Sequence, residues 1–543
     1  MAVADNTAEL INTLKETNEY LKSENEKLLK QISELSQNIA NLQETIDYLK
    51  RKMYGTSSEK TSKDVPGQLD LFNETEATAD ESVPEPTAED VIAGYTRNKA
   101  ANKASREGIV SSLPIQKVLC DMPEEERVCE LCGTPLEDTG EKFIREELQI
   151  IPAKVKRIHY YAKTYSCPKC KTEDGVFESI TAESPTPLLK HSLASPSTVA
   201  YIMTQKFAYA MPYYRMEAEW LQEGVKLPRA RMAYWVIYCA KNYLRPIYDR
   251  LREYLLERDI LHADEVPCQV LKEDGRPARA KSYMWVYLTG DDGEPGIVLY
   301  NYKPGRKGEY AKEFLKGYKG FLHCDGYQGY NSIEDVTRVG CIAHLRRKFF
   351  DAIPTDKSKD SPNLPAEVGV RYLNQLFDIE HTLKDNSPTT KKEKRLEKES
   401  PILDDFWNWV ESLNPVSGSK LDKAVIYAKN QKQNIMNVFL DGRLELTNSA
   451  AERKVKSYVI GRKNFLFHDT VDGAEASAIV YSLVETAKAN NLNIFQYLKT
   501  LLLFMPDYKN EPEGIEEMMP WSDFIQAACP GPHKEDSEIR LKS

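Results

Sequence analysis

The feature that most limits how this 543-residue chain can fold is a heptad repeat near its start. One leucine occurs every seven residues over six heptads, and a second, mostly isoleucine series precedes it by three positions. Two apolar positions per heptad form the seam of a coiled coil, and isoleucine with leucine in that seam favours two parallel strands. The two series are Leu14, Leu21, Leu28, Leu35, Leu42 and Leu49, and Ile11, Asn18, Asn25, Ile32, Ile39 and Ile46.

We therefore predict a leucine zipper over residues 8–53 and a homodimer or higher oligomer formed through it. The two asparagines in the seam are polar residues of the kind that fix register and partner number at some cost in stability. A single amphipathic helix packed on its own chain is the alternative, but the unbroken run of heptads favours the zipper.

The composition is typical of a soluble globular protein, with 41% hydrophobic and 29% charged residues. The first residues, MAVADNTAEL, lack the basic start and apolar stretch of a secretory signal. No apolar run approaches the ~20 residues that span a bilayer. We expect a cytoplasmic protein of several domains that has no membrane partner.

The net charge of −10 argues against a nucleic-acid partner, because a phosphate backbone attracts positive surface. However, eight acidic residues and no Lys or Arg lie between Asp70 and Asp90, so one segment supplies most of the acidic excess. This stretch is also rich in Pro and Thr and has too few apolar residues to form a core. We assign residues 54–110 to an acidic flexible linker and regard the rest of the chain as nearly neutral.

Two Cys-x-x-Cys pairs, separated by 34 residues with alternating apolar segments, predict a zinc ribbon over residues 111–185. Each pair can direct two thiolates at one tetrahedral ion, and four sulfur ligands leave no open position, so the zinc would be structural. A redox pair is the alternative, but thioredoxin-like chemistry needs one pair in a βαβ context that is absent here. The predicted Zn²⁺ ligands are Cys129, Cys132, Cys167 and Cys170.

Residues 186–258 have a helical pattern with three segments separated by Pro and Gly. Pro196 and Pro228 suit first-turn positions and Gly224 suits a helix end, so the second and third helices resemble a helix-turn-helix. The third helix would carry Arg229 and Arg231 at its start as DNA contacts. An ordinary helical bundle is an equally good interpretation.

From residue 259 the pattern changes to three short β-type runs, DILHADEVPCQVL, KSYMWVYLTG and GIVLYNY. A helix, a strand ending at Asp325, a helix, a strand and a final helix follow. This order is that of a ribonuclease H-like sheet, in which Asp264 on the first strand and Asp325 after the fourth would be neighbours. We assign residues 259–363 to the first part of this α/β core.

Two converging carboxylates repel one another and are best explained by hard cations, so we predict Mg²⁺ (or Mn²⁺) at this site. Two ions about 4 Å apart activate the attacking oxygen and stabilise the leaving oxygen in phosphoryl transfer. Glu265 is the rival ligand of Asp264, but adjacent strand residues face opposite sides. His344 is a further candidate near the phosphates, although a lone histidine after a strand is more often a structural hydrogen-bonding residue.

Four motifs in this region resemble those of the transposases of the insertion sequence 66 family. They are ADE around Asp264, CDGYQGY around Asp325, AHLRRKFFDA around His344 and LTNSAAERKVKSYVIGRKNFLF around Glu452. The resemblance extends to the zipper with MYGTSSEK, the cysteine pairs, the three-helix stretch and the terminal NIFQYLKTLL and MMPWS, and so covers nearly the whole chain. It implies a DDE-type enzyme whose acid triad is Asp264, Asp325 and Glu452, each a metal ligand, and accessory proteins of the same element.

The 126 residues between Asp325 and Glu452 exceed what a compact core needs, so we predict a helical insertion over residues 364–441. Its charged run KKEKRLEKE is expected on the surface. The second part of the core would cover residues 442–490, and residues 491–543 form a C-terminal segment. The chain is thus predicted to be multidomain α+β, with a coiled coil, a zinc ribbon, a helix-turn-helix-like domain and a ribonuclease H-like core.

The segment from Arg443 to Lys463 has six basic and two acidic residues, which predicts contact with DNA. Many transposases with this triad have a basic residue seven positions after the glutamate, but Val459 occupies that place here. The residues that could substitute for it, and that we predict to bind DNA, are Arg453, Lys456, Arg462 and Lys463.

The leading hypothesis is therefore a transposase that cuts DNA at the ends of an insertion sequence with metal-activated water and joins the freed 3′ hydroxyl to target DNA. A zipper-dimerised DNA-binding regulator with an inactive nuclease-like domain is one alternative. A ribonuclease H-like nuclease without joining activity is another.

Overall fold

The computed structural model describes residues 155–171, 177–183, 185–354 and 364–531, together with Lys22 and Lys27, which are helical. The predicted acidic linker, the first cysteine pair and nearly all of the predicted zipper lie outside the described residues. All described residues belong to one of the two compact units of the chain, the other being residues 56–153.

A hairpin lies at the second cysteine pair: β1 (Thr164–Lys171) contains this pair and runs antiparallel to β2 (Phe177–Thr181). The sequence also predicts a hairpin between the two cysteine pairs, and most of that stretch lies outside the described residues. Residues 155–163 of that stretch are irregular and exposed, and no strand among the described residues pairs with them.

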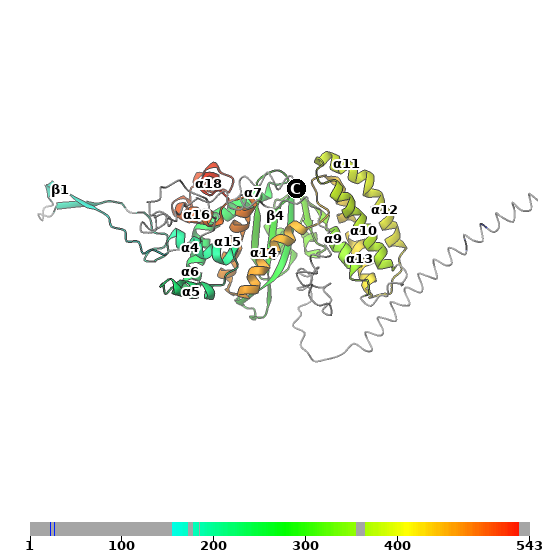
Figure 1. Ribbon diagram of the computed structural model, residues 1–543, viewed down its shortest axis with the longest axis horizontal. Helices are drawn as coiled ribbons and strands as arrows, with labels where there is room; N and C mark the ends of the chain where they lie inside the picture. Colours follow the sequence, from blue (N-terminus) through cyan, green and yellow to red (C-terminus); the bar gives the residue numbers. More distant parts are fainter. Residues whose placement is uncertain are drawn as a thin grey trace, which may run out of the picture. The chain divides into compact units, whose positions relative to one another are not determined.

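The core is a mixed sheet with the strand order β5-β4-β3-β6-β7, and β8 pairs with the far end of β3 (Figure 1). Strands β3, β4 and β5 are antiparallel neighbours, whereas β6, β7 and β8 are parallel to the strands they pair with. The strands are β3 (Ile260–Lys272), β4 (Lys281–Thr289), β5 (Val298–Lys303), β6 (Gly320–Cys324), β7 (Val336–Gly340) and β8 (His468–Thr470).

Short helices flank the parallel strands β6 and β7 as the sequence predicts, with one difference. Helix α8 (Gly308–Phe314) precedes β6, and α9 (Ile342–Phe350) follows β7. Between β6 and β7, however, lies only a 3-10 turn, η4 (Gln328–Ser332), because the sequence GYQGYNS is dominated by turn residues.

Two long helices cover the sheet and bring the C-terminal half of the chain onto it. Helix α14 (Ser449–Phe465) packs on β3, and α15 (Val471–Ala489) packs along β5. The hydroxyl groups of Ser482 and Thr486 accept hydrogen bonds from the N–H groups of Tyr300 and Val298. Side chains of α15 thereby satisfy the free edge of the sheet, which would otherwise be open to pairing with another chain.

The predicted helix-turn-helix segment forms α4 (Pro196–Met203), α5 (Tyr213–Gln222), α6 (Arg229–Cys239) and α7 (Arg245–Leu256), with π-turns η2 (Thr204–Ala208) and η3 (Ala240–Leu244). Gly224 ends α5 with a φ of +78°, which favours glycine, whereas Pro228 is the N-cap of α6 rather than a first-turn residue. These helices share their core with α15 and α16 (Ile494–Tyr508). They are therefore not an independent module.

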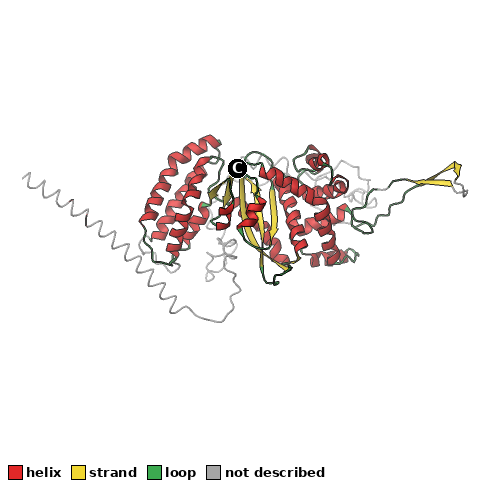
Figure 2. Cartoon of the chain, turned by 180° about the vertical axis from the view of Figure 1, so that it is seen from behind, coloured by secondary structure: helices red, strands yellow, loops and turns green. Residues whose placement is uncertain are grey.

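Four helices occupy the region of the expected insertion: α10 (Pro365–Thr382), α11 (Pro388–Lys398), α12 (Ser400–Ser412) and α13 (Lys420–Met436), followed by η5 (Asn437–Leu440). Helix α13 packs on α9 and on β7, so the insertion joins the sheet at the edge opposite α15. Figure 2 shows these helices and those around α15 with the sheet between them.

The expectation that KKEKRLEKE lies entirely on the surface is wrong. Arg395 and Glu399 are fully buried, and Arg395 donates two hydrogen bonds of 2.9 and 2.6 Å to the carboxylate of Glu380 on α10. Residues four apart share one face of a helix, so two of the charges in this run point into the bundle while the others face solvent.

The last described helices are α17 (Pro512–Glu517) and α18 (Asp523–Ala528), which pack on α16. Among the described helices, none is both long enough and apolar enough to cross a membrane.

Candidate active site

The parallel pairing of β3 and β6 brings Asp264 and Asp325 together. His262 on β3 is paired with His323 on β6, and the two aspartates each lie two residues further along, so the same register places them opposite one another. Alternate residues of a strand share a face, which puts both aspartates on the same side of the sheet. The sequence predicts this neighbourhood from strand order alone.

Two buried histidines support this pair of aspartates from within the sheet. The rings of His262 and His323 are stacked with their centroids 4.4 Å apart and their planes 10° apart. Burial lowers the pKa of His262 to about 4 and that of His323 well below its ordinary value, so both rings are neutral. Neutral stacked rings hold β3 and β6 in register without adding charge beneath the acids.

Asn448 fixes the start of α14, the helix that carries Glu452, on β3. The Asn448 amide donates a 2.8 Å hydrogen bond to the Ala263 carbonyl, and its oxygen lies 3.1 Å from Nδ1 of His262. An asparagine before a helix usually caps it through its own side chain, but this one makes no such bond. Its side chain instead anchors the first turn of α14, which carries Glu452, beside Asp264.

The acids and His344 form one electrostatic cluster. The pKa of Asp264 is raised well above its ordinary value because its carboxyl is buried and because Glu265 and Asp325 repel its charge. Although burial lowers it, the pKa of His344 is raised to about 9 by Cys341 and by the negative charges of Glu452 and Asp325. Because the pKa of Asp264 is raised, the charged form of its carboxyl is unfavourable, and an added positive charge would stabilise that form.

Glu265, the rival of Asp264, is bound by two other residues. Its side chain is fully buried, and its carboxylate accepts hydrogen bonds of 2.6 Å from Arg306 and 2.6 Å from the Tyr330 hydroxyl. Burial and repulsion by Asp325 raise the pKa of Glu265 to about 7. Asp264 accepts one hydrogen bond, from the N–H of Glu265, which leaves its carboxylate available for a ligand.

The turn that carries Asp325 is held from both sides. The carboxylate of Asp325 accepts a 2.9 Å hydrogen bond from the N–H of Tyr327, and Gly326 lies against α13. A Cβ atom added at Gly326 would lie 2.5 Å from the ring of Tyr427, so only glycine permits this close approach. The helical insertion thereby helps to position the strand end.

Three of the predicted DNA-binding residues lie on one exposed face of α14. Arg453, Lys456 and Lys463 are exposed, and their spacing of three and seven residues places them along the helix from Glu452 outward. Arg462 is different: it is only 9% exposed and donates a hydrogen bond to the Pro267 carbonyl on β3. The structure therefore gives Arg462 a packing role and removes it from the surface that DNA can reach.

The other predicted DNA contacts, Arg229 and Arg231, are exposed at the start of α6. This helix carries none of the residues of the acid cluster. Arg229 lies 4.0 Å from Glu217 in a solvent-exposed ion pair. Such a pair is weak and leaves the arginine able to exchange partners.

Sequence reasoning missed three residues that build the site: Asn448, His262 and His323. A possible signal for the histidines was their position two residues before each aspartate, on the same face of a strand. Nothing in the sequence pairs Asn448 with β3, because 184 residues separate it from Asp264 and a local cap was the ordinary interpretation.

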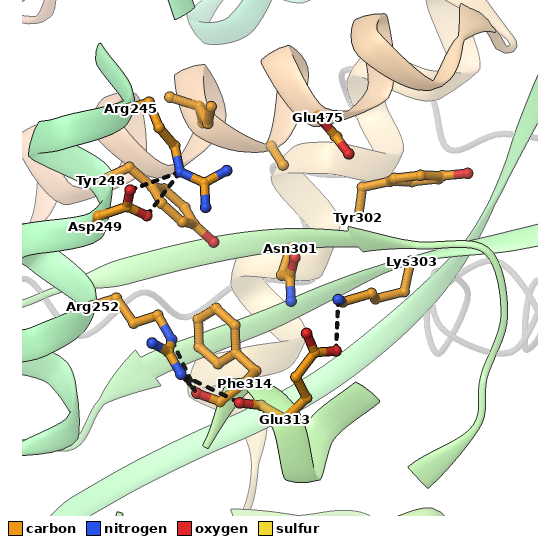
Figure 3. A pocket seen from close by; sticks show the side chains of 12 residues that line it. Arg245, Tyr248, Asp249, Arg252, Asn301, Tyr302, Lys303, Glu313, Phe314 and Glu475 are labelled. Carbon is orange, nitrogen blue, oxygen red and sulfur yellow. Dashed lines mark hydrogen bonds and ion pairs between the residues drawn. The ribbon is translucent and has the colours of Figure 1, made fainter. Parts of the chain in front are cut away.

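A hollow of the surface lies at β5, lined by α7, α8 and α15 (Figure 3). Its cations already have acceptors: Arg245 bonds Asp249, Lys303 bonds Glu313 at 2.9 Å, and Arg252 donates to the Phe314 carbonyl. Opposite charges neutralise one another within it, so this hollow does not attract a charged ligand as the acid cluster does.

Replacing Asn448 by alanine is expected to lower stability by about 1–3 kcal/mol, because it leaves a buried carbonyl and a buried imidazole without partners. Thermal unfolding should show a Tm lowered by a few degrees. Asn242→Ala is the matched control, since the side-chain amide of this exposed residue donates a local hydrogen bond to the Tyr238 carbonyl, four residues earlier. Equal Tm shifts in the two variants would contradict the anchoring role.

Four family models match the chain. The model described as "Transposase IS66 family" matches residues 191–476, more than half of the chain, and "IS66 C-terminal element" matches 482–521. "Zinc-finger binding domain of transposase IS66" matches residues 126–171, which contain all four cysteines of the predicted zinc site, and supports structural zinc. "Transposase C of IS166 homeodomain" matches residues 41–118, at the end of the predicted zipper and the linker.

The chain is also similar to proteins of Sinorhizobium fredii (strain NBRC 101917 / NGR234) that are described only as uncharacterized. It is 29% identical to y4qI over 69% of this chain and 70% of the relative. It is 26% identical to y4hP over 88% of this chain and 87% of the relative, and 27% identical to y4jD over 88% and 93%. Their names add no activity.

Proposed function

The chain belongs to the IS66 family of transposases, and from this premise we propose that it cuts and joins DNA at the ends of an insertion sequence. Asp264, Asp325 and Glu452 are the proposed catalytic acids, as in a DDE enzyme. The observation that carries the proposal is the register of β3 and β6, which sets the two aspartates opposite one another, together with the hydrogen bond that holds the start of α14, the helix of Glu452, on β3.

The strand order supports the fold that this chemistry requires. Three antiparallel strands followed by two parallel strands, with a further helix crossing them, is the arrangement we propose to be ribonuclease H-like. In that arrangement the carboxyl end of β6 and the middle of β3 open on the same face, and the first turn of α14 closes the third side.

The donor set fits a hard divalent cation such as Mg²⁺ (or Mn²⁺). All three proposed ligands are carboxylates, and burial together with repulsion by Glu265 and Asp325 raises the pKa of Asp264, so a bound cation would stabilise its charged form. When bound, such ions supply the activation of an attacking oxygen and the stabilisation of a leaving oxygen. The residues of the chain contribute by holding three carboxylates in fixed positions and by keeping Glu265 paired with Arg306.

DNA would approach along the exposed face of α14. Arg453, Lys456 and Lys463 offer positive charge that begins next to Glu452 and continues to the end of the helix, as contacts to successive phosphates require. Arg229 and Arg231 at the start of α6 are further proposed phosphate contacts. Helix α14 is also held to the body of the protein, since its Lys454 forms a 2.9 Å ion pair with Glu485 of α15.

Two further modules are proposed to organise the complex. Cys129, Cys132, Cys167 and Cys170 would hold one structural Zn²⁺, and the heptads would join two or more copies of the chain. Oligomers suit the task because two ends of an element must be brought together. Accessory proteins of the same element remain proposed partners.

A strand-transfer assay tests the function. Full-length protein, Mg²⁺, DNA carrying the element ends and a target plasmid are expected to yield end-to-target joints, which sequencing of the products identifies. Asp264→Asn should abolish them, because it removes the charge of a proposed metal ligand while keeping its shape. Asp274→Asn, in the exposed turn after the same strand, is the control and should leave joining unchanged.

Three outcomes would overturn the proposal in different ways. Cut ends without joints would indicate a nuclease. Binding of end DNA without cutting would indicate a regulator with an inactive core. Unchanged joining by Asp264→Asn would remove the catalytic role of that residue.

A further inference from the structure

We propose that Cys341, His344 and Glu452 form a second metal site that takes a zinc-class transition-metal ion and shares Glu452 with the acid triad. The inference rests on the proposed function for the role of Glu452, but the site itself is argued from its own geometry. Among the described residues, this is the group of histidine, cysteine and acidic side chains whose ligand atoms converge: they lie within 4.8 Å of one another.

Local structure explains why Cys341 and His344 point to one place. Cys341 is the N-cap of α9, directly after β7, and His344 follows it by three residues, which is close to one turn of helix. Residues three apart lie on the same side of a helix. The backbone thus aims a thiol and an imidazole in the same direction from a rigid strand-to-helix junction.

The start of α14 brings the third ligand to them. The N–H of Asn448 donates a 3.2 Å hydrogen bond to Sγ of Cys341, which ties the two helix starts together. Glu452, one turn further along α14, then places its Oε1 3.6 Å from Nδ1 of His344. An N–H directed at the sulfur would also stabilise a thiolate, the form of cysteine that binds metal.

The Nδ1 atom of His344 has no hydrogen-bond partner although it is buried. A buried ring nitrogen without a partner costs free energy, and its distance from Glu452 is too long for a hydrogen bond. An ion held between the imidazole and the carboxylate would satisfy both groups.

The donor set selects the class of ion. A thiolate, an imidazole and a carboxylate are ligands of Zn²⁺ and Co²⁺, whereas Mg²⁺ prefers oxygen alone. Three protein ligands also leave a fourth position open, as in zinc sites that bind water or a substrate oxygen. The proposed ion is therefore distinct in class from the cation expected between Asp264 and Asp325.

Sharing Glu452 gives the site a consequence for the reaction. A zinc-class ion held by Cys341 and His344 would draw the carboxylate of Glu452 toward itself and away from the position between the aspartates. Zinc added to the Mg²⁺ reaction should therefore inhibit it, and loss of the thiol should relieve the inhibition. We expect Cys341→Ser to require at least about 10–100-fold more Zn²⁺ for the same inhibition, because losing even a group that only supports a metal ligand has an effect of that size.

Cobalt absorption tests the site without any use of activity. Full-length protein whose zinc content has been measured as one ion per chain, which fills the predicted four-cysteine site, is titrated with Co²⁺. Wild-type protein is expected to develop one equivalent of thiolate-to-cobalt absorption, and Cys341→Ser and His344→Ala are expected to lose or weaken it. Cys239→Ser is the matched control, because Cys239 is also free and buried but lies on α6.

The outcomes separate this inference from the proposed function. Absence of the band in wild-type protein, or its persistence in Cys341→Ser, would overturn the second site even if strand transfer proceeds as proposed. A band that depends on Cys341 in a protein that joins no DNA would support the site and count against the transposase mechanism. Tm values of Cys341→Ser and His344→Ala, measured without added metal, show whether a lost band reflects lost ligands or a lost fold. If both variants are misfolded, the stoichiometry of cobalt binding to wild-type protein and the inhibition by zinc decide whether the second site exists.

Discussion

Replacing Asp325 by asparagine is expected to reduce end cleavage by about 1,000-fold, which corresponds to a loss of about 4 kcal/mol of transition-state stabilisation. Metal ions contribute several kcal/mol to such reactions, and an amide is a weaker ligand than a carboxylate. Asp325 is central among the acids because its charge acts on Asp264, Glu265 and His344. Single-turnover cleavage of an end-labelled DNA at saturating Mg²⁺ measures the effect.

The control for this variant is Asp335→Asn, ten residues along the chain. Asp335 is exposed, forms only a 3.9 Å ion pair with Lys319, and has a φ of +59°, which asparagine tolerates well. Its rate should match that of the wild type. Cleavage by Asp325→Asn within a few fold of the wild-type rate would show that Asp325 binds no catalytic ion.

Replacing Arg306 by leucine is expected to destabilise the protein by about 3 kcal/mol, because it removes the cation from a carboxylate that is fully buried. The loss should increase with pH. Glu265 has a pKa raised to about 7, so it binds a proton more readily in the folded than in the unfolded state. Its carboxyl is neutral at low pH, and the stability that the bound proton contributes is lost as the pH rises through about 7.

Thermal unfolding at pH 5.5 and pH 8.5 measures this dependence, and a double variant tests its cause. Adding Glu265→Gln to Arg306→Leu removes the unpaired charge while keeping a hydrogen-bond acceptor for Tyr330. The double variant should recover most of the lost stability at pH 8.5 and little at pH 5.5. If it is no more stable than Arg306→Leu alone, the buried charge is not the reason for the loss.

The sequence could predict the sheet and the two aspartates because these features depend on short-range patterns. Each β-type run has apolar residues on both faces of the strand and ends at a turn. An acid that directly follows such a run must lie at a strand end. The match to the IS66 models confirms the family that four motifs predicted. The alternation of side chains allowed only one of Asp264 and Glu265 to face the site, and the family resemblance selected Asp264; in the structure Glu265 accepts hydrogen bonds from Arg306 and Tyr330.

Features that depend on long-range packing could not be predicted in the same way. A basic residue in a basic helix was assigned to DNA, but Arg462 is covered by β3 and bonds the Pro267 carbonyl. A charged run was assigned to the surface, but Arg395 finds Glu380 on a neighbouring helix. In each case the partner is far away in sequence, and only the fold supplies it.

The placement of Glu452 also depends on long-range packing that a short-range pattern does not reveal. Its role came from a resemblance between motifs, since no periodicity relates it to the strands. The structure supplies the physical link through Asn448, which holds the first turn of α14 on β3, and through His344, which lies 3.6 Å from the carboxylate of Glu452. The third acid is thus held by contacts that its own sequence neighbourhood does not reveal.

Anomalous diffraction from crystals of the full chain bound to end DNA and Mn²⁺ locates the catalytic ion itself instead of its effects. We expect a manganese signal about 2 Å from carboxylate oxygens of both Asp264 and Asp325, with Glu452 as a further ligand. A manganese ion held by Glu265 in place of Asp264, or an active complex in which the three carboxylates bind no ion, would contradict it.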